Sequence, residues 1–432
     1  MLRLRAILAA LLLGAPLGAQ AAEVTRIASS FDEDDPFDLF LDVRFRRTQT
    51  HTKVTREQLS DQIVNPEAPD DEEFTPGRIE RPEVWHRGSD TRLDIALAIG
   101  LYKDLEFSFG LPLILQQNDN YAFVSDTNDS NSTIINNRLN PDGSTTVSPR
   151  SLFTVPSTSK RGGLGNMRFG LAYAFFNQNR DDTKPMWLIG LDYELPTAKQ
   201  RDPSLDNTGD DRGNVGDRVH KYTFYTSFSR KMGVADPYFK AHYTVPVQGP
   251  GIYSNCFDGE SQGVPGNCFV GKWTRKETGI KAPHVTGFLF GSEFTAFSDK
   301  NKGQKFALDV RAIGTYVSSG RYYNELSAAL GKLLATQEYF QVGGQFGATA
   351  SAGEAFTLRA SGTFLYNTDH ALTNENLGVA PEEIRTSGGV LDPASNTNVN
   401  PNFDFRTDLV SRRFRATESK TFRLELSAAF AF

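Results

Sequence analysis

The sequence predicts an all-β protein, a transmembrane antiparallel up-and-down β-barrel of about 12 strands with long extracellular loops. Three observations predict this fold class: a secretory leader, a C-terminal segment that alternates apolar and polar residues up to Phe432, and the same alternation in the apolar segments between them. A period of two suits a membrane barrel, because each strand turns one face to lipid and the other to the lumen.

The first 21 residues have the pattern of a signal peptide. Arg3 and Arg5 precede an apolar run from Ala6 to Leu13, and small residues follow as far as Ala21. We expect cleavage near Ala21 and a mature chain in the outer membrane of a Gram-negative bacterium. No later segment offers the roughly 18 apolar residues of a membrane helix. The expected organisation is a signal peptide over 1–21, an N-terminal periplasmic segment over 22–36 and the barrel over 37–432.

The last strand is the reference for the topology. Phe422, Leu424 and Leu426 share one face, while Arg423 and Glu425 share the other. This ending, with Phe432 as its last residue, resembles the assembly signal of bacterial outer-membrane barrels. The resemblance implies the barrel-assembly machinery as a partner and places this end of the strand at the periplasm. That placement sets the direction of every earlier strand.

Eleven earlier segments repeat the alternation, as in Leu93, Ile95, Leu97 and Ile99. Short turns such as 102–104 separate some of them. Long polar loops, such as the forty or so residues after Arg46 and the segment 116–160, separate the others. Short turns on one side and long loops on the other are typical of outer-membrane barrels. The segments lie near 37–46, 91–101, 105–113, 167–173, 187–193, 222–228, 239–245, 288–294, 306–316, 340–346 and 356–364.

The segment 321–335 fits either a strand or a helix. A strand here would raise the count to 13, and an odd number would place a long loop on the wrong side of the membrane. As a helix, the segment brings Tyr323, Leu326, Leu330 and Leu333 to one face, with Asn324 as a cap. We therefore predict one short loop helix near 322–334.

The residues of opposite parity define the predicted lumen. On the lipid face near the midplane each Lys or Arg would cost about 2–4 kcal/mol, so charges in mid-strand belong inside. They either pair and brace a narrow interior or line a constriction that selects solutes by charge and size. Basic and acidic positions balance, which argues against strong ion selectivity. The lumen-lining candidates are Asp42, Arg44, Arg46, Arg92, Asp94, Glu106, Arg168, Asp192, Lys221, Lys240, Glu293, Asp309, Arg311, Arg359, Arg423 and Glu425, beside Asp38 and Glu194.

The remaining reactive residues point to few kinds of site. Cys256 and Cys268 lie in one Gly/Pro-rich stretch of an exported chain, so we expect a disulfide. All six histidines fall in outer loops or on the outward halves of strands and have no metal-ligand spacing, so we expect no metal and no cofactor. The expected surroundings are outer-membrane lipid and lipopolysaccharide. The formal net charge of −6 disfavours nucleic acid.

Two stretches carry a family resemblance. The stretch Gly162-Gly-Leu-Gly-Asn-Met-Arg-Phe-Gly-Leu171, followed by Leu188-Ile-Gly-Leu-Asp-Tyr-Glu-Leu-Pro-Thr197, resembles the family associated with the MetA pathway of phenol degradation. That family has a G-L-G-D strand start, a hairpin and an L-P-T-G strand end. Asn166 replaces the Asp here, and Ala198 replaces the Gly. The resemblance implies a porin-like channel for passive diffusion of small molecules, including hydrophobic or aromatic ones.

Two alternatives remain open. A closed barrel would act as a structural or surface-recognition protein through its extracellular loops. An outer-membrane lipid-modifying enzyme would need a Ser from another strand beside His220 or His284, because the sequence has no G-x-S-x-G and no H-E-x-x-H motif. We therefore expect the chain not to be an enzyme.

Overall fold

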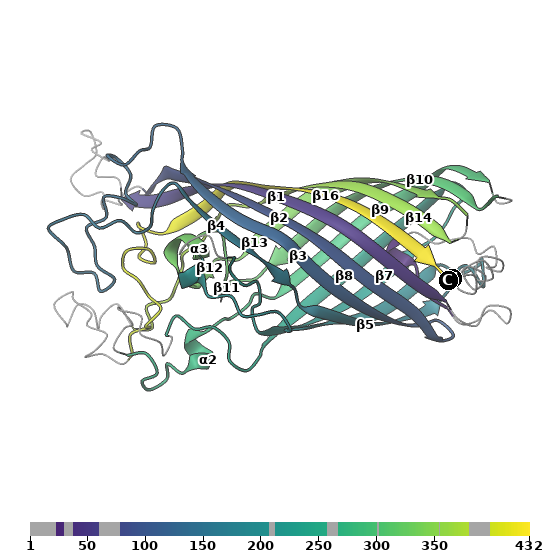
Figure 1. Cartoon of the computed structure of the whole chain (residues 1–432), viewed down its shortest axis with the longest axis horizontal. Helices are drawn as coiled ribbons and strands as arrows, with labels where there is room; N and C mark the ends of the chain where they lie inside the picture. The colour runs from purple at the N-terminus through teal and green to yellow at the C-terminus, as the bar shows by residue number, and fades with distance from the viewer. Residues whose placement is uncertain are drawn as a thin grey trace, which may run out of the picture.

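Twelve antiparallel strands form a closed barrel, which confirms the predicted fold class and strand number (Figure 1). The computed structural model describes residues 23–29, 38–59, 78–206, 212–256, 267–299, 302–353, 355–379 and 398–432. Strand order follows the chain, and the last strand pairs with the first. The wall strands are β1 (Leu39–Leu59), β2 (Arg78–Tyr102), β3 (Leu105–Phe123), β5 (Met167–Phe176), β6 (Met186–Leu195), β7 (Val219–Ser229), β8 (Ala235–Gln248), β9 (Val285–Asp299), β10 (Gln304–Val317), β13 (Tyr339–Ser351), β14 (Phe356–Asn367) and β16 (Phe414–Ala431).

The outer wall of the barrel is apolar. Phe288, Phe290, Phe346 and Leu426 each expose more than half of their surface on the outside. Charged residues in mid-strand, such as Arg359 and Glu425, have the opposite parity and line interior space. An apolar outer face and a charged inner face suit a wall between lipid and water, because an unpaired charge is costly in hydrocarbon.

The barrel closes through β16 and β1. Glu425 lies opposite Arg46 and Arg423 lies opposite Thr48. From the sequence we expect Arg423 and Glu425 to neighbour Asp42 and Arg44 of the first strand, but the observed partners lie four residues further along β1. A shift by an even number of residues keeps every side chain on the same face. The inward parity of Arg423 and Glu425 is therefore unchanged.

The strands at the extracellular end extend far beyond their predicted ends. The stretches after Arg46 and after Gln116 are predicted loops, yet β1 continues to Leu59, β2 begins at Arg78 and β3 continues to Phe123. Outside the membrane both faces of a strand meet water or loops, so no apolar alternation marks these extensions in the sequence. Two further strands lengthen the wall there, namely β4 (Ser157–Leu164) beside β3 and β15 (His370–Ala371) beside β16.

The predicted helix near 322–334 is only partly correct. One helical turn, α3 (Ser327–Leu330), lies between two short paired strands, β11 (Gly320–Tyr322) and β12 (Leu334–Thr336). Gly331 ends this turn with φ = 66°, a left-handed conformation that favours glycine. We call residues 320–336 the mouth hairpin. It lies toward the end of the barrel opposite the C-terminus, which is the extracellular end (Figure 1).

Residues 23–29 enter the periplasmic end of the lumen, and we call them the N-terminal strap. They begin with one 3-10 turn, η1 (Glu23–Thr25). Ile27 packs against Ala172 and Leu188, which face inward from β5 and β6. The strap belongs to the predicted segment 22–36, whose other residues, like the predicted signal peptide, lie outside the described residues.

The remaining helical turns lie in the extracellular loops. They are η2 (Pro203–Leu205) and α2 (Arg275–Thr278). In the described part of the chain, no helix is long and apolar enough to cross a membrane. The predicted disulfide between Cys256 and Cys268 is confirmed, with the two Cα atoms 5.4 Å apart.

Candidate functional site: a polar cavity in the extracellular half of the lumen

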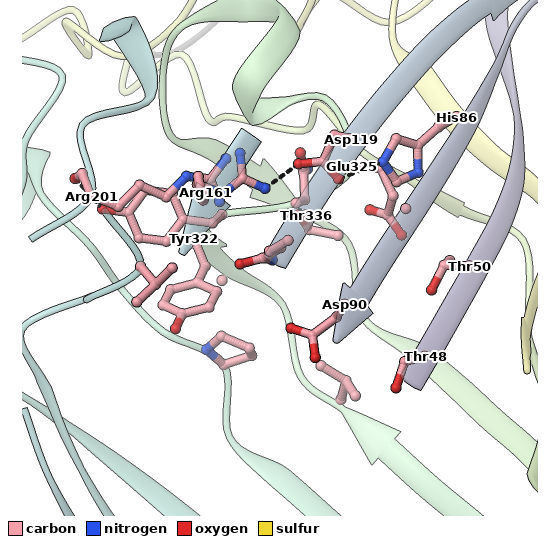
Figure 2. A pocket seen from close by; sticks show the side chains of 18 of the residues that line it. Thr48, Thr50, His86, Asp90, Asp119, Arg161, Arg201, Tyr322, Glu325 and Thr336 are labelled. Atoms are coloured by element: carbon pink, nitrogen blue, oxygen red, sulfur yellow. Dashed lines mark hydrogen bonds and ion pairs between the residues drawn. The ribbon is translucent and has the colours of Figure 1, made fainter. Parts of the chain in front are cut away.

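A cavity of about 390 Å³ lies inside the extracellular half of the barrel. Strands β1 to β4 form one wall, with Thr50, His86 and Asp119 among the lining residues (Figure 2). The mouth hairpin forms the facing wall with Tyr322 and Glu325. Most of the lining residues are polar or charged, as expected where inward-facing residues meet water rather than lipid.

Buried ion pairs form one side of the cavity. Arg161 of β4, which is 1% exposed, pairs with Asp119 and donates from Nη1 to Oδ2 of Asp206 at 3.1 Å. Nε of Arg201 donates to the same Asp206 oxygen at 2.8 Å. Nε2 of His86 lies 2.9 Å from Oδ1 of Asp119. Two guanidinium groups and two carboxylates thus neutralise one another, which a buried charge requires.

Hydrogen bonds hold the mouth hairpin against the cavity. The Tyr121 hydroxyl donates to the carbonyl oxygen of Glu325 at 2.6 Å, and the Tyr323 hydroxyl donates to the carbonyl oxygen of Arg201 at 2.8 Å. The Tyr322 hydroxyl donates to Asp217 at 2.5 Å. The hairpin is therefore connected both to the barrel wall and to the loop between β6 and β7.

Ion pairs join the opposite side of the mouth hairpin to the last extracellular loop. Nε of Arg321 donates to Glu375 at 2.7 Å, and Nζ of Lys332 donates to Asp404 at 2.8 Å. Although burial alone raises the pKa of Asp404, Lys332 and Arg406 hold that pKa below its ordinary value. The hairpin thus has ionic contacts at both of its ends.

Below the cavity, a group of predicted lumen residues crosses the barrel near β1, β2 and β16. Arg46 lies 3.3 Å from Asp94 and 2.6 Å from Glu425. Arg92 donates to both carboxylate oxygens of Asp90, at 2.7 and 2.8 Å. Opposite charges therefore alternate across this level of the lumen.

A smaller cavity of about 70 Å³ lies between this level and the periplasm. Three predicted basic residues, Arg44, Arg311 and Arg359, line it together with Asp309 and Glu425. Asp309 accepts from Nη2 of Arg311 at 2.6 Å and from the hydroxyl of Tyr238. The structure thus gathers residues from β1, β10, β14 and β16 around one small polar space.

The other predicted lumen residues do not join these two cavities. Arg168 and Lys221 both pair with Glu194, at 3.3 and 3.0 Å. Glu293 pairs with Lys305, and Lys240 lies over the ring of Tyr225. Glu106 accepts a hydrogen bond from the backbone N–H of Ala28. Asp192 lies opposite Gly170 of β5. Asp42 lies 3.5 Å from Arg44 and 3.9 Å from Arg359, and Arg423 lies opposite Thr363.

Sequence reasoning missed the residues that define the larger cavity. Asp119 and Arg161 fall in or beside a predicted polar loop, and no spacing links them to Arg201 or Asp206. The sequence places all six histidines in outer loops or on the outward halves of strands, but His86 and His370 are only 3% and 1% exposed and line the cavity. Both lie in stretches that the sequence presents as loops, so alternation could not reveal their inward direction.

The two rim histidines considered for an enzyme have tyrosine partners. Nδ1 of His220 lies 2.7 Å from the hydroxyl of Tyr193, and Nδ1 of His284 lies 2.9 Å from the hydroxyl of Tyr243. Within the described residues, neither ring is hydrogen-bonded to a serine hydroxyl. The arrangement needed for a serine hydrolase is not assembled there.

No family model and no curated protein matches the sequence. Among solved structures, an outer-membrane channel from Pseudomonas putida F1 covers 91% of this chain and 95% of its own, with 9% identity and a TM-score of 0.42. A FadL homologue from Pseudomonas aeruginosa covers 96% and 98%, with 9% identity and a TM-score of 0.37. The outer-membrane protease OmpT of Escherichia coli covers 91% and 97%, with 7% identity and a TM-score of 0.30. Function must therefore be inferred from the site, and the resemblance to the phenol-degradation family stays a prediction.

Proposed function

We propose that the protein is an outer-membrane channel for the passive diffusion of small polar solutes. The polar cavity of about 390 Å³ inside a barrel with an apolar outer wall carries this proposal. An apolar outside suits lipid, and a polar, water-filled inside is what porin-like barrels use to pass solutes. The hydroxyl, amide and charged side chains of the lining favour a solute with polar or charged groups over a purely hydrophobic one.

Two cavities at different depths support a path through the lumen. The larger one borders Asp90, and the smaller one borders Arg44 and Glu425. The pairs made by Arg92 and Arg46 lie between them. A solute that moves from one cavity to the other would exchange contacts with these charges, which makes this level the proposed constriction.

A closed barrel that acts through its loops is the second candidate. The ion pairs across the lumen and the N-terminal strap favour it, because both occupy interior space. The two candidates differ in a measurable quantity, namely the conductance of the purified barrel.

The deciding experiment records single-channel currents in planar bilayers and solute-dependent swelling of liposomes. The channel predicts stepwise currents, a larger conductance or altered ion preference for Arg44→Ala and Arg311→Ala, and a several-fold larger conductance after removal of residues 23–29. Arg168→Ala is the matched control, because Arg168 lies on β5 away from the small cavity and its side chain is 47% exposed. Heat-modifiable migration on gels verifies folding. Silence of all these proteins across many solutes would support the closed barrel instead.

A further inference from the structure

The charges around the larger cavity leave one carboxylate without a partner. Arg161 and Arg201 are engaged by Asp119 and Asp206, and Arg92 engages Asp90. Glu325 also lines the cavity, and its carboxylate forms no ion pair or hydrogen bond with any described residue. Counted together, these groups leave one negative charge over at the cavity.

Two further acceptor atoms at the cavity lack partners. Nε2 of His86 is hydrogen-bonded to Asp119, whose carboxylate accepts hydrogen bonds, so in the neutral ring Nδ1 is the acceptor. His86 is 3% exposed, and its Nδ1 has no partner among the described residues. The same holds for Oδ1 of Asn118, which also borders the cavity. A buried acceptor without a donor is costly, and a ligand with N–H groups would satisfy it.

Aromatic rings complete the lining on the hairpin side. Tyr339 stacks on His370 with ring centroids 4.2 Å apart, and Tyr322 and Tyr323 come from the mouth hairpin. Rings attract cations through their faces. Tyr121 connects the two walls near these groups, because its ring centroid lies 5.4 Å from that of His86 and its hydroxyl donates to the backbone carbonyl oxygen of Glu325 at 2.6 Å. Glu325 and His86 both line the cavity, and Figure 2 draws them next to each other.

We infer that this cavity binds small organic cations that carry an ammonium group, with Glu325 as the residue that determines specificity. The inference rests on the proposed channel function and names the solute class that the channel selects. The ammonium group donates to Glu325, to Nδ1 of His86 and to Oδ1 of Asn118, while an apolar part of the solute packs on the tyrosines. Nε of Arg161 and Nη2 of Arg201 have no hydrogen-bond partner among the described residues. Anions are nevertheless disfavoured, because Asp119 and Asp206 already compensate the charges of both arginines.

Binding is tested with three probes of similar shape, 2-phenylethylammonium chloride, 2-phenylethanol and sodium 3-phenylpropanoate. Isothermal titration calorimetry is performed on the full folded barrel in detergent at neutral pH. The ammonium probe should bind at least about tenfold more tightly than the alcohol, as expected for hydrogen bonds to a charged group. The anionic probe should bind most weakly. Equal affinity for all three probes, or a preference for the anion, would overturn the inference.

Variants assign the effect to the carboxylate. Glu325→Gln should lower the affinity for the ammonium probe about tenfold and leave the affinity for the alcohol unchanged. Glu325→Asp keeps the carboxylate and should restore part of the lost affinity for the ammonium probe. Asn118→Leu removes an acceptor but no charge, and it should also lower the affinity for the ammonium probe. Glu338→Gln is the matched control, because Glu338 is exposed, lies near the hairpin and does not line the cavity. Equal losses in the Glu325→Gln and Glu338→Gln proteins would contradict a role specific to Glu325.

A bilayer recording separates this inference from the proposed function. In a salt gradient the wild type should prefer cations, and the Glu325→Gln protein should show a reversal potential closer to zero. A barrel that conducts but does not distinguish the probes keeps the channel and loses the cation site. A barrel that binds the ammonium probe and never conducts supports the cation site and overturns the channel.

Discussion

The two ends of the lumen are filled in different ways. At the extracellular end the mouth hairpin is held by ion pairs with the last loop and by tyrosine hydroxyls, next to the buried pairs of Arg161. At the periplasmic end the N-terminal strap is held by the packing of Ile27, by Arg26 over the ring of Phe40, and by hydrogen bonds such as the one from Ala28 N–H to Glu106 at 2.6 Å.

This difference distinguishes a fixed element from a movable one. Removal of one partner from a buried ion pair leaves an uncompensated charge, so the extracellular network opens only at high cost. The buried apolar residues of the seven-residue strap are Ile27 and Ala28, so its displacement exposes little apolar surface and costs less. We therefore expect the hairpin to shape the cavity permanently, while the strap is the part that can leave the lumen.

The largest expected effect concerns Arg161. Arg161→Met leaves Asp119 and Asp206 without their shared cation, and we expect the free energy of opening of β3 and β4 to fall by about 3–5 kcal/mol. Hydrogen exchange of the amides in β3 and β4 measures this change. A decrease in this opening free energy of less than about 1 kcal/mol, the usual value for an exposed ion pair, would mean that the extracellular end is not held more firmly than the strap.

A pH change tests the loop that anchors the hairpin. Burial raises the pKa of Asp408 from 3.8 to about 6, and its carboxylate accepts from the backbone N–H groups of Glu375 and Asp404 at 3.0 Å. The folded loop therefore holds a proton that the unfolded chain releases. The protonated Asp408 therefore contributes on the order of 3 kcal/mol to the stability of the loop at low pH, and this contribution is lost as pH rises from about 4 through about 6.

Protection of residues 398–413 against hydrogen exchange, corrected for the intrinsic effect of pH, should thus be weaker at pH 7 than at pH 5. Asp404 stays ionised over this range because its pKa is lowered, so it adds no opposing change. In Asp408→Asn the corrected protection should be independent of pH. A wild-type protein with equal protection at both pH values would show that Asp408 does not titrate in this window.

The third effect concerns the strap. Ile27→Ala removes buried apolar contacts with Ala172, Ala174 and Leu188 and should lower the cost of displacing the strap by about 2 kcal/mol. Because 1.4 kcal/mol corresponds to a factor of ten, the displaced fraction should rise by about 30-fold. More frequent openings in bilayer recordings would show this. Unchanged openings, in a variant whose folding is intact, would mean that the strap is as fixed as the hairpin.

The smallest effect is expected at an exposed pair outside the barrel. Nζ of Lys281 lies 2.6 Å from Oε2 of Glu277, and the two side chains are 48% and 45% exposed. Lys281→Met should change the stability by no more than about 0.5 kcal/mol, because water screens the pair. Urea unfolding of Lys281→Met and of Arg161→Met compares the loss of unfolding free energy in the two variants. Equal losses would indicate that burial does not determine how much an ion pair contributes to stability.

The sequence was informative wherever lipid imposes a pattern. Alternation identified all twelve wall strands and the inward parity of residues such as Arg46, Asp94 and Glu425, because a charge on the lipid face is costly. It did not identify how far β1 and β2 continue, because Thr48 to Gln58 face water or loops on both sides. Without an apolar face, an extended strand and a polar loop have the same pattern.

The candidate site depends on contacts between distant parts of the chain. Arg161 meets Asp119 and Asp206 across 42 and 45 residues, and each residue alone has the pattern of a solvated loop charge. The spacing of Leu326, Leu330 and Leu333 favours a helix, but helical structure stops at Gly331, and the flanking residues pair as β11 and β12. Local periodicity cannot report such pairing, which arises only when the hairpin folds into the mouth.

The length of β2 determines where a solute first meets the protein. Its 25 residues, at about 3.3 Å each and tilted by about 45°, rise about 60 Å, more than twice the apolar band of about 25 Å. Asp90 and His86 lie 12 and 16 residues above the periplasmic end at Tyr102, which places them about 28 and about 37 Å up the wall. The cavity therefore lies above the hydrocarbon layer. In the proposed channel, a charged solute would lose part of its hydration there before it enters the part of the barrel that hydrocarbon surrounds.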